Sequence, residues 1–418
     1  MKQTGKIARF LMITTLITCL GISLSANGLN LNGVGSKAIA MGGAFIGLAD
    51  DYSAIFWNPA GLTQMKNPSV SFFVTDLIPS GTYAFPAYGI DAKTKSAMYP
   101  SGAVGYFKPI NEKLLIGIAA YVPSGTGAKW DGEDLKLLSK NVAYKWESFM
   151  AVVTVSPVVA YKINDMFSLG ATLNLNYGMM KIKRPGLGQY TEDLTGFAFG
   201  ATLGALIKPI DRLGIGLTLR TPTKVKFSGD AEMASAALYH LSTTSGAKRE
   251  ATWPLWLGVG VSFKATDKLT INADAQYTNW KKIDTIGITY DDAVWQASKA
   301  HPLLGAAFNN DFVLNWKDKI QYRLGMEYAF CSKMSLRAGY YYDPSPSPAE
   351  TLNVLLPEIT YNAVTAGLGY KTDKISFDFC LEYLMGKKQL SPMPPAGKMP
   401  GTHGMNILVP NIGITYHF

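Results

Sequence analysis

The sequence predicts an all-β protein, a transmembrane antiparallel barrel of about fourteen strands whose lumen is closed by an N-terminal hatch. Three observations predict this fold. After Ser25, no apolar run approaches the ~20 residues that a membrane helix needs. Long segments alternate apolar with polar residues, and the connections between them alternate between short and long.

The N-terminus reads as an export signal. Lys2, Lys6 and Arg9 precede an apolar run of about 15 residues, Phe10 to Leu24, and small residues beside it suit cleavage before Ala26. A retained membrane helix is the alternative, but the run is short and no stop-transfer segment follows it. We therefore expect residues 1–25 to be a signal peptide and the mature protein to be exported.

Composition narrows the class of the exported chain. Hydrophobic residues make up 48% and charged residues 17%, with 41 Gly and 22 Tyr. This leaves two classes, a large secreted β protein or an outer-membrane barrel. The net charge of +9 falls to +6 (9 − 3) once the three basic residues of the signal are removed, which does not suggest nucleic-acid binding.

The length of the alternating segments and the composition of their polar face distinguish between these two classes. In Ser168 to Met179 one face is apolar throughout, and the other holds Gly, Ser, Thr and Asn. Strands of soluble sandwiches usually have about five or six residues and an outward face with many charges. Longer segments with a crowded polar face fit strands that cross a bilayer around a polar lumen.

The connections test the barrel independently. Those after even-numbered segments are short and those after odd-numbered segments are long, which places both termini in the periplasm and the long loops outside the cell. The C-terminal Phe418 resembles the signal that barrel-assembly machinery reads. We predict strands at Val70–Thr75, Gly102–Lys108, Lys113–Val122, Phe149–Lys162, Phe167–Ile182, Gly196–Ile207, Arg212–Arg220, Thr252–Lys264, Lys268–Thr278, Lys319–Phe330, Met334–Tyr342, Asn362–Tyr370, Lys374–Met385 and Pro410–Phe418.

One stretch, Asn27 to Leu62, matches neither the signal nor the strands. Its centre, Ala38 to Ala49, is small and apolar and suits a short irregular helix. Turn-forming residues then interrupt it, and Pro59 removes a backbone donor. We interpret residues 26–66 as a compact hatch and 67–418 as the barrel. The hatch residues we single out are Gly42, Gly43, Asp50, Asp51, Asn58, Pro59 and Ala60, with the glycines as flexible points.

Over essentially its whole mature length the chain resembles the FadL family of outer-membrane transporters for long-chain fatty acids and other hydrophobic compounds. The likeness is carried by GSKAIAMGGAFIGLADDYSAIFWNPAGL, by DRLGIGLTLRTPTKVKFSGD, by the Asp343-Pro344-Ser345-Pro346 loop and by the terminal strand. The resemblance implies a fourteen-stranded barrel with a hatch, capture of ligand by apolar loops, an interior pocket and a sideways exit where the third strand is interrupted. Mapped here, this window comprises Tyr121, Val122, Pro123, Ser124 and Gly125, although Pro123 could simply begin a loop.

Charged residues on the polar, lumen-facing side of the predicted strands are the remaining indication of a ligand-binding site: Arg220, Asp274, Arg323, Glu327, Arg337, Asp378 and Glu382. In one interpretation four of them pair across the lumen and hold the barrel or the hatch: Arg323, Arg337, Glu327 and Asp378. In the other, cations receive a fatty-acid carboxylate through charge-assisted hydrogen bonds, with Arg220, Arg323 and Lys317 as candidates. Aromatic residues of the long loops could form an apolar landing patch or the cores of those loops: Trp130, Trp146, Trp295 and Tyr239.

The sequence therefore predicts passive uptake of long-chain fatty acids or similar hydrophobic molecules, with exit near the third strand. A channel for aromatic or other uncharged hydrocarbons is the alternative, followed by a general diffusion porin. Lipid hydrolysis would need a Ser–His pair, and none of the four histidines has a nucleophile signalled nearby. We expect no enzyme activity, no cofactor, no metal site and no nucleic acid. The expected partners are a hydrophobic small molecule, outer-membrane lipid and, through Phe418, the assembly machinery, and we expect a monomer.

Overall fold

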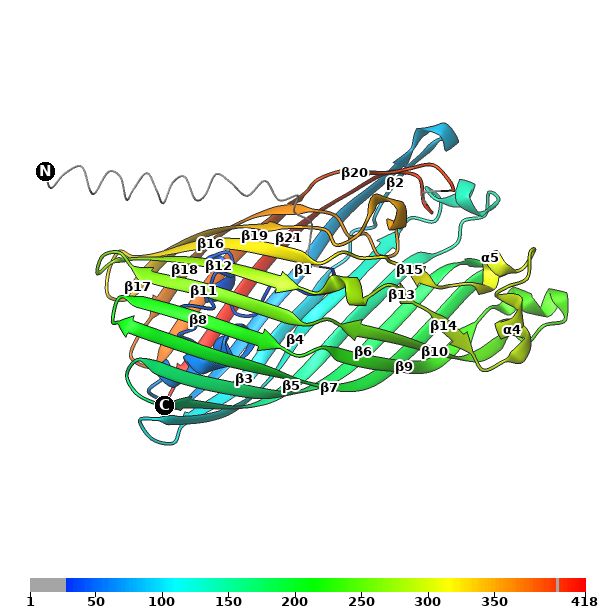
Figure 1. Cartoon of the computed structure of the whole chain (residues 1–418). Coiled ribbons are helices and arrows are strands. Elements are labelled where there is room, and N and C mark those ends of the chain that lie inside the picture. Colours follow the sequence, from blue (N-terminus) through cyan, green and yellow to red (C-terminus); the bar gives the residue numbers. More distant parts are fainter. Residues whose placement is uncertain (1–27, 396–397) are drawn as a thin grey trace, which may run out of the picture.

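The computed structural model describes residues 28–395 and 398–418, so the predicted signal peptide lies outside the described residues. Antiparallel strands form a closed barrel (Figure 1), because β1 (Ser69–Phe85) pairs with both β3 (Tyr99–Pro109) and the last strand, β21 (Gly401–His417). The fourteen-stranded antiparallel barrel predicted from the sequence is confirmed.

Between β3 and β21 the wall consists of β4 (Leu114–Trp130), β5 (Trp146–Lys162), β6 (Phe167–Gly186), β7 (Gly188–Ile210), β8 (Leu213–Arg220) with β9 (Thr223–Glu232), β10 (Thr244–Trp253) with β11 (Trp256–Lys264), β12 (Leu269–Thr278), β16 (Lys319–Ala329), β17 (Met334–Asp343), β18 (Tyr361–Lys371) and β19 (Ile375–Gly386). The long connections carry short strands and helices: β2 (Ile90–Lys93), β13 (Thr285–Ile286), β14 (Ile288–Tyr290), β15 (Phe312–Val313), β20 (Gln389–Ser391), α4 (Ala293–Ser298), α5 (Gly305–Phe308) and the 3-10 turns η2 (Pro86–Tyr88), η3 (Lys136–Ser139), η4 (Ala234–Tyr239), η5 (Trp280–Lys282) and η6 (Ala349–Thr351).

Several strands run further outward than predicted. The third strand was expected to end at Val122 but continues to Trp130, and β9 and β10 lie in a stretch expected to be a loop. The reason is that the apolar face of the strands changes sides between the membrane part and the outer part of the barrel. In the membrane-facing part apolar side chains point outward, with Phe197 73% and Phe199 71% exposed, whereas in β9 Val225 and Phe227 are buried and the intervening lysines are exposed. The outer strands therefore follow the pattern of a soluble sheet around an apolar core.

The outer part of the barrel encloses that core. Trp253, Trp280, Trp295 and Trp316 are buried in it together with side chains of the long connections. Its polar centre is a fully buried ion pair between Arg249 and Glu192, with both side chains 0% exposed and Nε 2.9 Å from Oε1. The outer end is thus a packed assembly of strands and loops.

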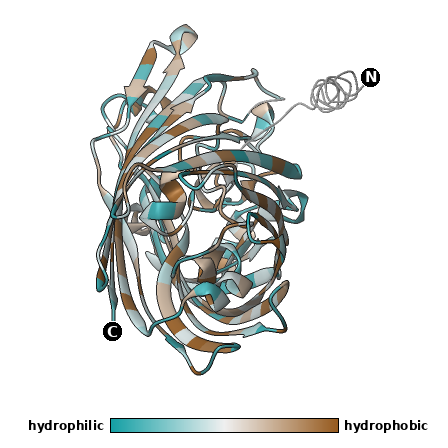
Figure 2. Ribbon diagram, turned by 90° about the vertical axis from the view of Figure 1, so that its left-hand side faces the viewer, coloured by the Kyte–Doolittle hydropathy of each residue, from teal (hydrophilic) through white to brown (hydrophobic). Residues whose placement is uncertain are grey.

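The N-terminal stretch lies inside the lumen. Residues 28–66, called the hatch below, contain α2 (Ser36–Ala40), α3 (Ala54–Trp57) and the 3-10 turn η1 (Pro59–Gln64), and the two helices and the turn are largely buried. Figure 2 views the molecule from the end at which the C-terminus lies and shows helical turns within the ring of strands. No helix in the described ranges is long and apolar enough to cross a membrane.

Glycines of the wall allow the hatch to lie directly against the strands. An added Cβ at any of them would run into hatch atoms, and at five of the seven these are backbone atoms of the hatch. From the sequence, these glycines are predicted only to lie on the polar face of their strands. They are Gly170 against Pro59, Gly204 against Asn58, Gly216 against Ile46, Gly260 against Gly47, Gly325 against Met41, Gly339 against Gly42 and Gly367 against Ala40.

Candidate functional site

Two wall residues bind the backbone of the hatch near its glycines. The carboxylate of Asp274 in β12 accepts from Phe45 N at 2.8 Å and from Ile46 N at 3.0 Å. Thr365 in β18 accepts from Gly42 N at 3.0 Å and donates to Ala40 O at 2.9 Å. Buried backbone groups are costly to leave unpaired, so these contacts fix the turn after α2 to the wall.

Gly42 and Gly43, expected to be flexible points, lie in this turn. Both have positive φ, 64° and 67°, a conformation that glycine adopts without strain. Gly42 also contacts the β16 and β17 backbone, and Gly43 contacts the guanidinium of Arg323. Because these two glycines have no side chain, the turn packs closely against the wall.

Arg323 and Arg220, two of the three candidate cations, hold the hatch. Arg323 donates to Gly42 O at 2.8 Å and to Asn32 O at 3.0 Å and is 2% exposed. Arg220 donates to Phe56 O at 3.0 Å and lies over the Phe56 ring at 4.4 Å. Lys317 is exposed in the connection between β15 and β16, and the structure does not bring it together with the two arginines in one cavity. Their role as ligands of a carboxylate stays a prediction.

The other predicted hatch residues form its second half. Asn58 donates to Ile46 O inside the hatch and to Ala205 O of the wall, both at 3.0 Å, and its Oδ1 accepts from Ala60 N. Pro59 begins η1, where a missing backbone donor is tolerated. Asp50 pairs with Lys37 at 2.8 Å, and Asp51 accepts from the backbone and hydroxyl of Ser53.

A second charged cluster stands between the hatch and the short turns of the barrel. Arg337 is 2.6 Å from Glu327 and 2.5 Å from Asp378, and these pairs line a polar cavity of about 400 Å³ together with Lys37 and Asp51. These ion pairs join β17 to its neighbour β16 and to β19, one strand further along the wall, and do not reach across the lumen. That they hold the barrel together stays a prediction.

The third barrel strand, β4, is irregular at the predicted window. Its register with β5 shifts between Tyr121 and Ser124, which is a β-bulge. Its pairing with β3 ends at the Ala103–Tyr121 pair, although β4 continues outward and the outer end of β3 stays paired with β1. Beyond Tyr121 the two neighbouring strands therefore separate.

A piece of the hatch occupies the edge of β4 that β3 leaves free. Leu31 N donates to Pro123 O at 3.0 Å, and Gly125 N donates to Leu29 O at 3.1 Å. The side chains of Asn30 and Ser124 face each other, with Oγ 3.3 Å from Oδ1. Residues 29–31, called the N-terminal strap below, thus add a short strand at the interruption.

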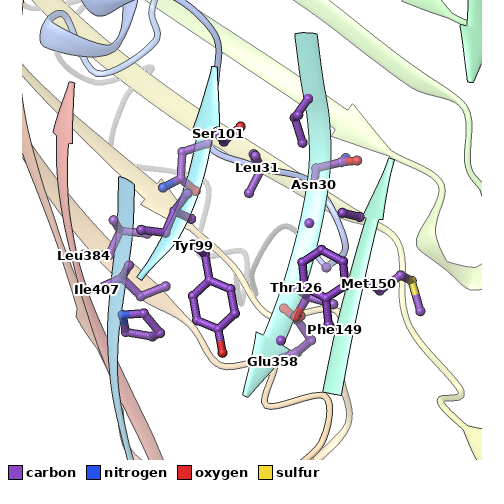
Figure 3. Close-up of a pocket in the computed structure, with 18 of the residues that line it drawn as sticks. Asn30, Leu31, Tyr99, Ser101, Thr126, Phe149, Met150, Glu358, Leu384 and Ile407 are labelled. Atoms are coloured by element: carbon purple, nitrogen blue, oxygen red, sulfur yellow. The ribbon is translucent and has the colours of Figure 1, made fainter. Parts of the chain in front are cut away.

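A largely apolar cavity of about 290 Å³ opens beside the strap. Side chains from β3, β4, β5 and the inward-folded connection between β17 and β18 converge on it, and Tyr99, Thr126, Phe149 and Glu358 gather around it in Figure 3. Its volume is near the lower end of the roughly 300–1,000 Å³ typical of small-molecule sites. No lysine, arginine or histidine is among the described residues that line it.

A smaller cavity of about 40 Å³ lies on the other side of the strap. Asn30 lines both cavities, while Pro123, Ser124 and Arg220 line the smaller one. The strap therefore separates the larger, apolar cavity from the smaller, more polar one.

The inward fold of the connection from Pro344 to Thr360 was not predicted from the sequence. It folds inward, and its backbone is held by Trp130 Nε1 donating to Val354 O at 2.7 Å and by Ser345 Oγ donating to Glu358 O at 2.7 Å. Trp130 and Trp295 are buried and Tyr239 is exposed, so these tryptophans belong to loop cores. The one charged residue in the apolar stretch 352–359, Glu358, was the signal available in the sequence.

Comparisons with known proteins place these features in a wider group. Residues 17–393 match the family described as outer membrane protein transport protein (OMPP1/FadL/TodX). The chain is similar to the 47 kDa outer membrane protein of Pasteurella multocida, with 23% identity over 93% of this chain and 94% of that protein. It is also similar to the long-chain fatty acid transport protein of Escherichia coli, with 23% identity over 86% of this chain and 87% of the relative.

Solved structures share the fold. A FadL homologue of Pseudomonas aeruginosa superposes with a TM-score of 0.77 at 17% identity, covering 94% of this chain and 100% of that chain. The toluene transporter TbuX of Ralstonia pickettii superposes with a TM-score of 0.70 at 19% identity, covering 93% and 99%.

Proposed function

This chain belongs to the family of outer-membrane transport proteins that includes FadL and TodX, and on that premise we propose that it takes up hydrophobic molecules through the apolar cavity and releases them sideways between β3 and β4. Members of the family are outer-membrane transport channels and not enzymes. The proposal concerns the route and the cargo.

The single observation that carries the route is the position of the apolar cavity. Tyr99 and Ser101 of β3 line it on one side of the interruption, and Gly125 and Thr126 of β4 line it on the other. Farther outward the wall is joined again, because Lys95 N donates to Lys129 O at 2.7 Å. A molecule in the cavity therefore lies beside the stretch of wall in which two neighbouring strands do not pair.

The firmness of the hatch also favours a sideways route. Passage straight through the lumen would break the bonds of Asp274, Thr365 and both arginines to the hatch, with a net cost of roughly 1 kcal/mol for each neutral hydrogen bond and more for each charged one. Releasing the strap breaks two backbone hydrogen bonds to β4 and the side-chain bond between Asn30 and Ser124, a net cost on the order of 2–4 kcal/mol. Strap opening is thus the less costly motion, and we infer that the strap is the gate.

Such a route needs no energy source. Each methylene that leaves water gains roughly 0.8 kcal/mol, in the cavity and in the membrane alike. Capture and exit are therefore both downhill from water, provided that the cavity binds no more tightly than the membrane does.

Between the two candidate cargoes, the cavity favours uncharged molecules over an ionised fatty acid. Its described lining offers two buried carboxyls, Asp343 and Glu358, and no cation to receive a carboxylate. Relatives support both cargo classes, since one is named a long-chain fatty acid transport protein and another a toluene transporter.

Uptake by whole cells tests this function. Cells that lack their own transporters of this family would be given radiolabelled toluene or oleate, with and without this protein. We expect the protein to accelerate toluene uptake several-fold more than oleate uptake. Acceleration of oleate alone would overturn the cargo assignment, and acceleration of neither would overturn the function.

A further inference from the structure

The apolar cavity has an acidic end. Glu358, from the inward-folded connection, and Asp343, from the outer end of β17, both line it and are 7% and 3% exposed. Figure 3 shows Glu358 close to Thr126 and Phe149, at one end of the group of apolar side chains. A carboxyl group buried among apolar side chains is costly unless a partner satisfies it.

The protein satisfies Glu358 poorly. The hydrogen bond recorded for its side chain within the described residues is from Thr126 Oγ1 to Oε1, and it is long at 3.4 Å. Asp343 Oδ1 accepts from Gln321 Nε2 at 2.6 Å. No ion pair to either carboxyl is found among residues 28–395 and 398–418. Burial, and next the neighbouring Asp343, raise the pKa of Glu358 to about 8, while the Thr126 bond opposes the shift.

A purely structural role does not account for the carboxyl of Glu358. Its backbone carbonyl, not its side chain, receives the Ser345 bond that fixes the connection. Arg323, the wall cation that acts on the neighbouring Asp343, is already engaged by Gln321 and by two hatch carbonyls. The free side of the carboxyl instead faces the cavity.

We propose that this end is a head-group subsite that selects hydrophobic amines: the ammonium group binds Glu358 and Asp343 while the apolar tail lies along Phe149, Met150 and Leu384. This inference rests on the proposed function and assigns a substrate class to the same cavity. An ammonium group donates hydrogen bonds that both carboxyls accept, and charge-assisted bonds of this kind are the stronger ones. A carboxylate in the same place would meet two acids and no base.

The pH dependence of binding distinguishes this subsite from simple partition into an apolar hole. The titratable groups around Glu358 are Asp343 and Tyr361, with Arg323 behind Asp343 and Glu382 beyond it. A protonated Glu358 must lose its proton before it can pair with an ammonium group. Amine binding is therefore expected to strengthen roughly 15-fold between pH 6.5 and 8, as the ionised fraction of a carboxyl with a pKa of about 8 rises, whereas an alcohol of equal length should be insensitive to pH.

The test is calorimetric titration of the purified whole protein in a nonionic detergent with octylamine, octanol, octanoate and toluene at pH 6.5 and 8. Glu358→Gln removes the charge at constant shape. Glu350→Gln in the same connection is the matched control, since Glu350 is exposed and does not line the cavity. We expect octylamine to bind at least tenfold more tightly than octanoate at pH 8. Glu358→Gln should reduce that preference several-fold, leaving only the contribution of Asp343, while it leaves octanol binding unchanged and Glu350→Gln leaves the preference unchanged.

The other possible results of this titration would overturn either the amine subsite or the proposed transport function. Equal affinities for octylamine and octanoate, or equal effects of the two glutamine variants, would overturn the amine subsite while toluene binding still supports the cavity as the transport site. Failure of toluene and octanol to bind at all would overturn the proposed function itself. The net positive charge of the chain favours octanoate in any nonspecific association, so a preference for the amine cannot arise from it.

Discussion

Arg323 Nη1 lies 2.8 Å from the carbonyl oxygen of Gly42, so one of the cations named from the sequence as a candidate carboxylate ligand binds the backbone of the hatch. The same guanidinium reaches Asn32 O, just beyond the strap, and stacks over Tyr341 at 4.3 Å. One wall residue thereby fixes both the glycine turn of the hatch and the base of the proposed gate.

Replacing Arg323 should therefore loosen the hatch rather than weaken cargo binding. Arg323→Ala leaves the buried carbonyl of Gly42 and the partly buried carbonyl of Asn32 without this donor, a cost of about 2 kcal/mol, so amide exchange in residues 40–46 should become roughly 30-fold faster. Hydrogen exchange read by mass spectrometry measures this. Unchanged exchange combined with weaker octanoate binding would return Arg323 to the role of a carboxylate ligand.

The wall glycines should be as important to the hatch as its hydrogen bonds. In Gly339→Ala the new methyl group would overlap Gly42, and the hatch should dock incompletely although the barrel still assembles. Single-channel recording in planar bilayers should then show ion leakage that the wild type lacks. Gly287→Ala is the control, because its methyl group would meet nothing closer than 3.6 Å. Equal conductance of both variants would count against close packing as the seal.

Docking of the hatch should depend on pH through Asp51. Burial raises the pKa of Asp51 to about 6, and Lys37 partly opposes the shift. Because this pKa exceeds the ordinary value of 3.8, the docked state binds the proton more tightly than the solvated state, and docking should strengthen as the pH falls from 7 to 4.

Between pH 7 and pH 4, the opening equilibrium of the hatch amides should shift on the order of 100-fold toward the closed state. The measured exchange rates are first corrected for the intrinsic pH dependence of amide exchange. Asp51→Asn should abolish this shift, and the exposed Asp267→Asn should not. A hatch that loosens on acidification would mean that the carboxyl is ionised and stabilising when docked.

The outer assembly should depend on its buried ion pair. Arg249 donates to Glu192 and also to Ile286 O and Asn310 O, so it joins β10 to the connection before β16. Arg249→Met leaves Glu192 buried without its partner, a loss of roughly 3–5 kcal/mol, and residues 279–318 should become sensitive to protease on intact cells.

Lys248→Met is the matched control for this variant. Its pair with Asp291 is more than half exposed on both sides, so its loss should leave the digestion pattern unchanged. Resistance of the Arg249 variant to digestion would show that the loops are held by their apolar core alone.

The membrane part of the fold could be predicted from the sequence because lipid and lumen impose opposite polarity on alternate residues. Ser168 to Met179 shows this pattern without interruption, and it lies within β6. The outer strands could not be found in the same way. At Val225 and Phe227 the apolar side chains point inward, and the surrounding lysines give the stretch the composition of a loop.

The site was only partly predictable for a similar reason. Pro123 marks the interruption of the third strand, since a proline removes a ladder donor wherever it falls. The partners of Arg323 and the inward fold of Glu358 depend on contacts between residues hundreds of positions apart in the chain. Neither alternation nor spacing along the chain encodes such contacts.

The central claim, sideways exit past the N-terminal strap, is tested most directly by fixing the strap to β4. Asn30→Cys with Ser124→Cys, in a Cys331→Ser background, places two thiols where side-chain oxygens now lie 3.3 Å apart. If the strap is the gate, oxidation to the disulfide should reduce toluene uptake by cells to the background rate, and a reducing agent should restore it, while each single cysteine variant should transport normally under both conditions. Undiminished uptake by the fully oxidised double variant would contradict the account.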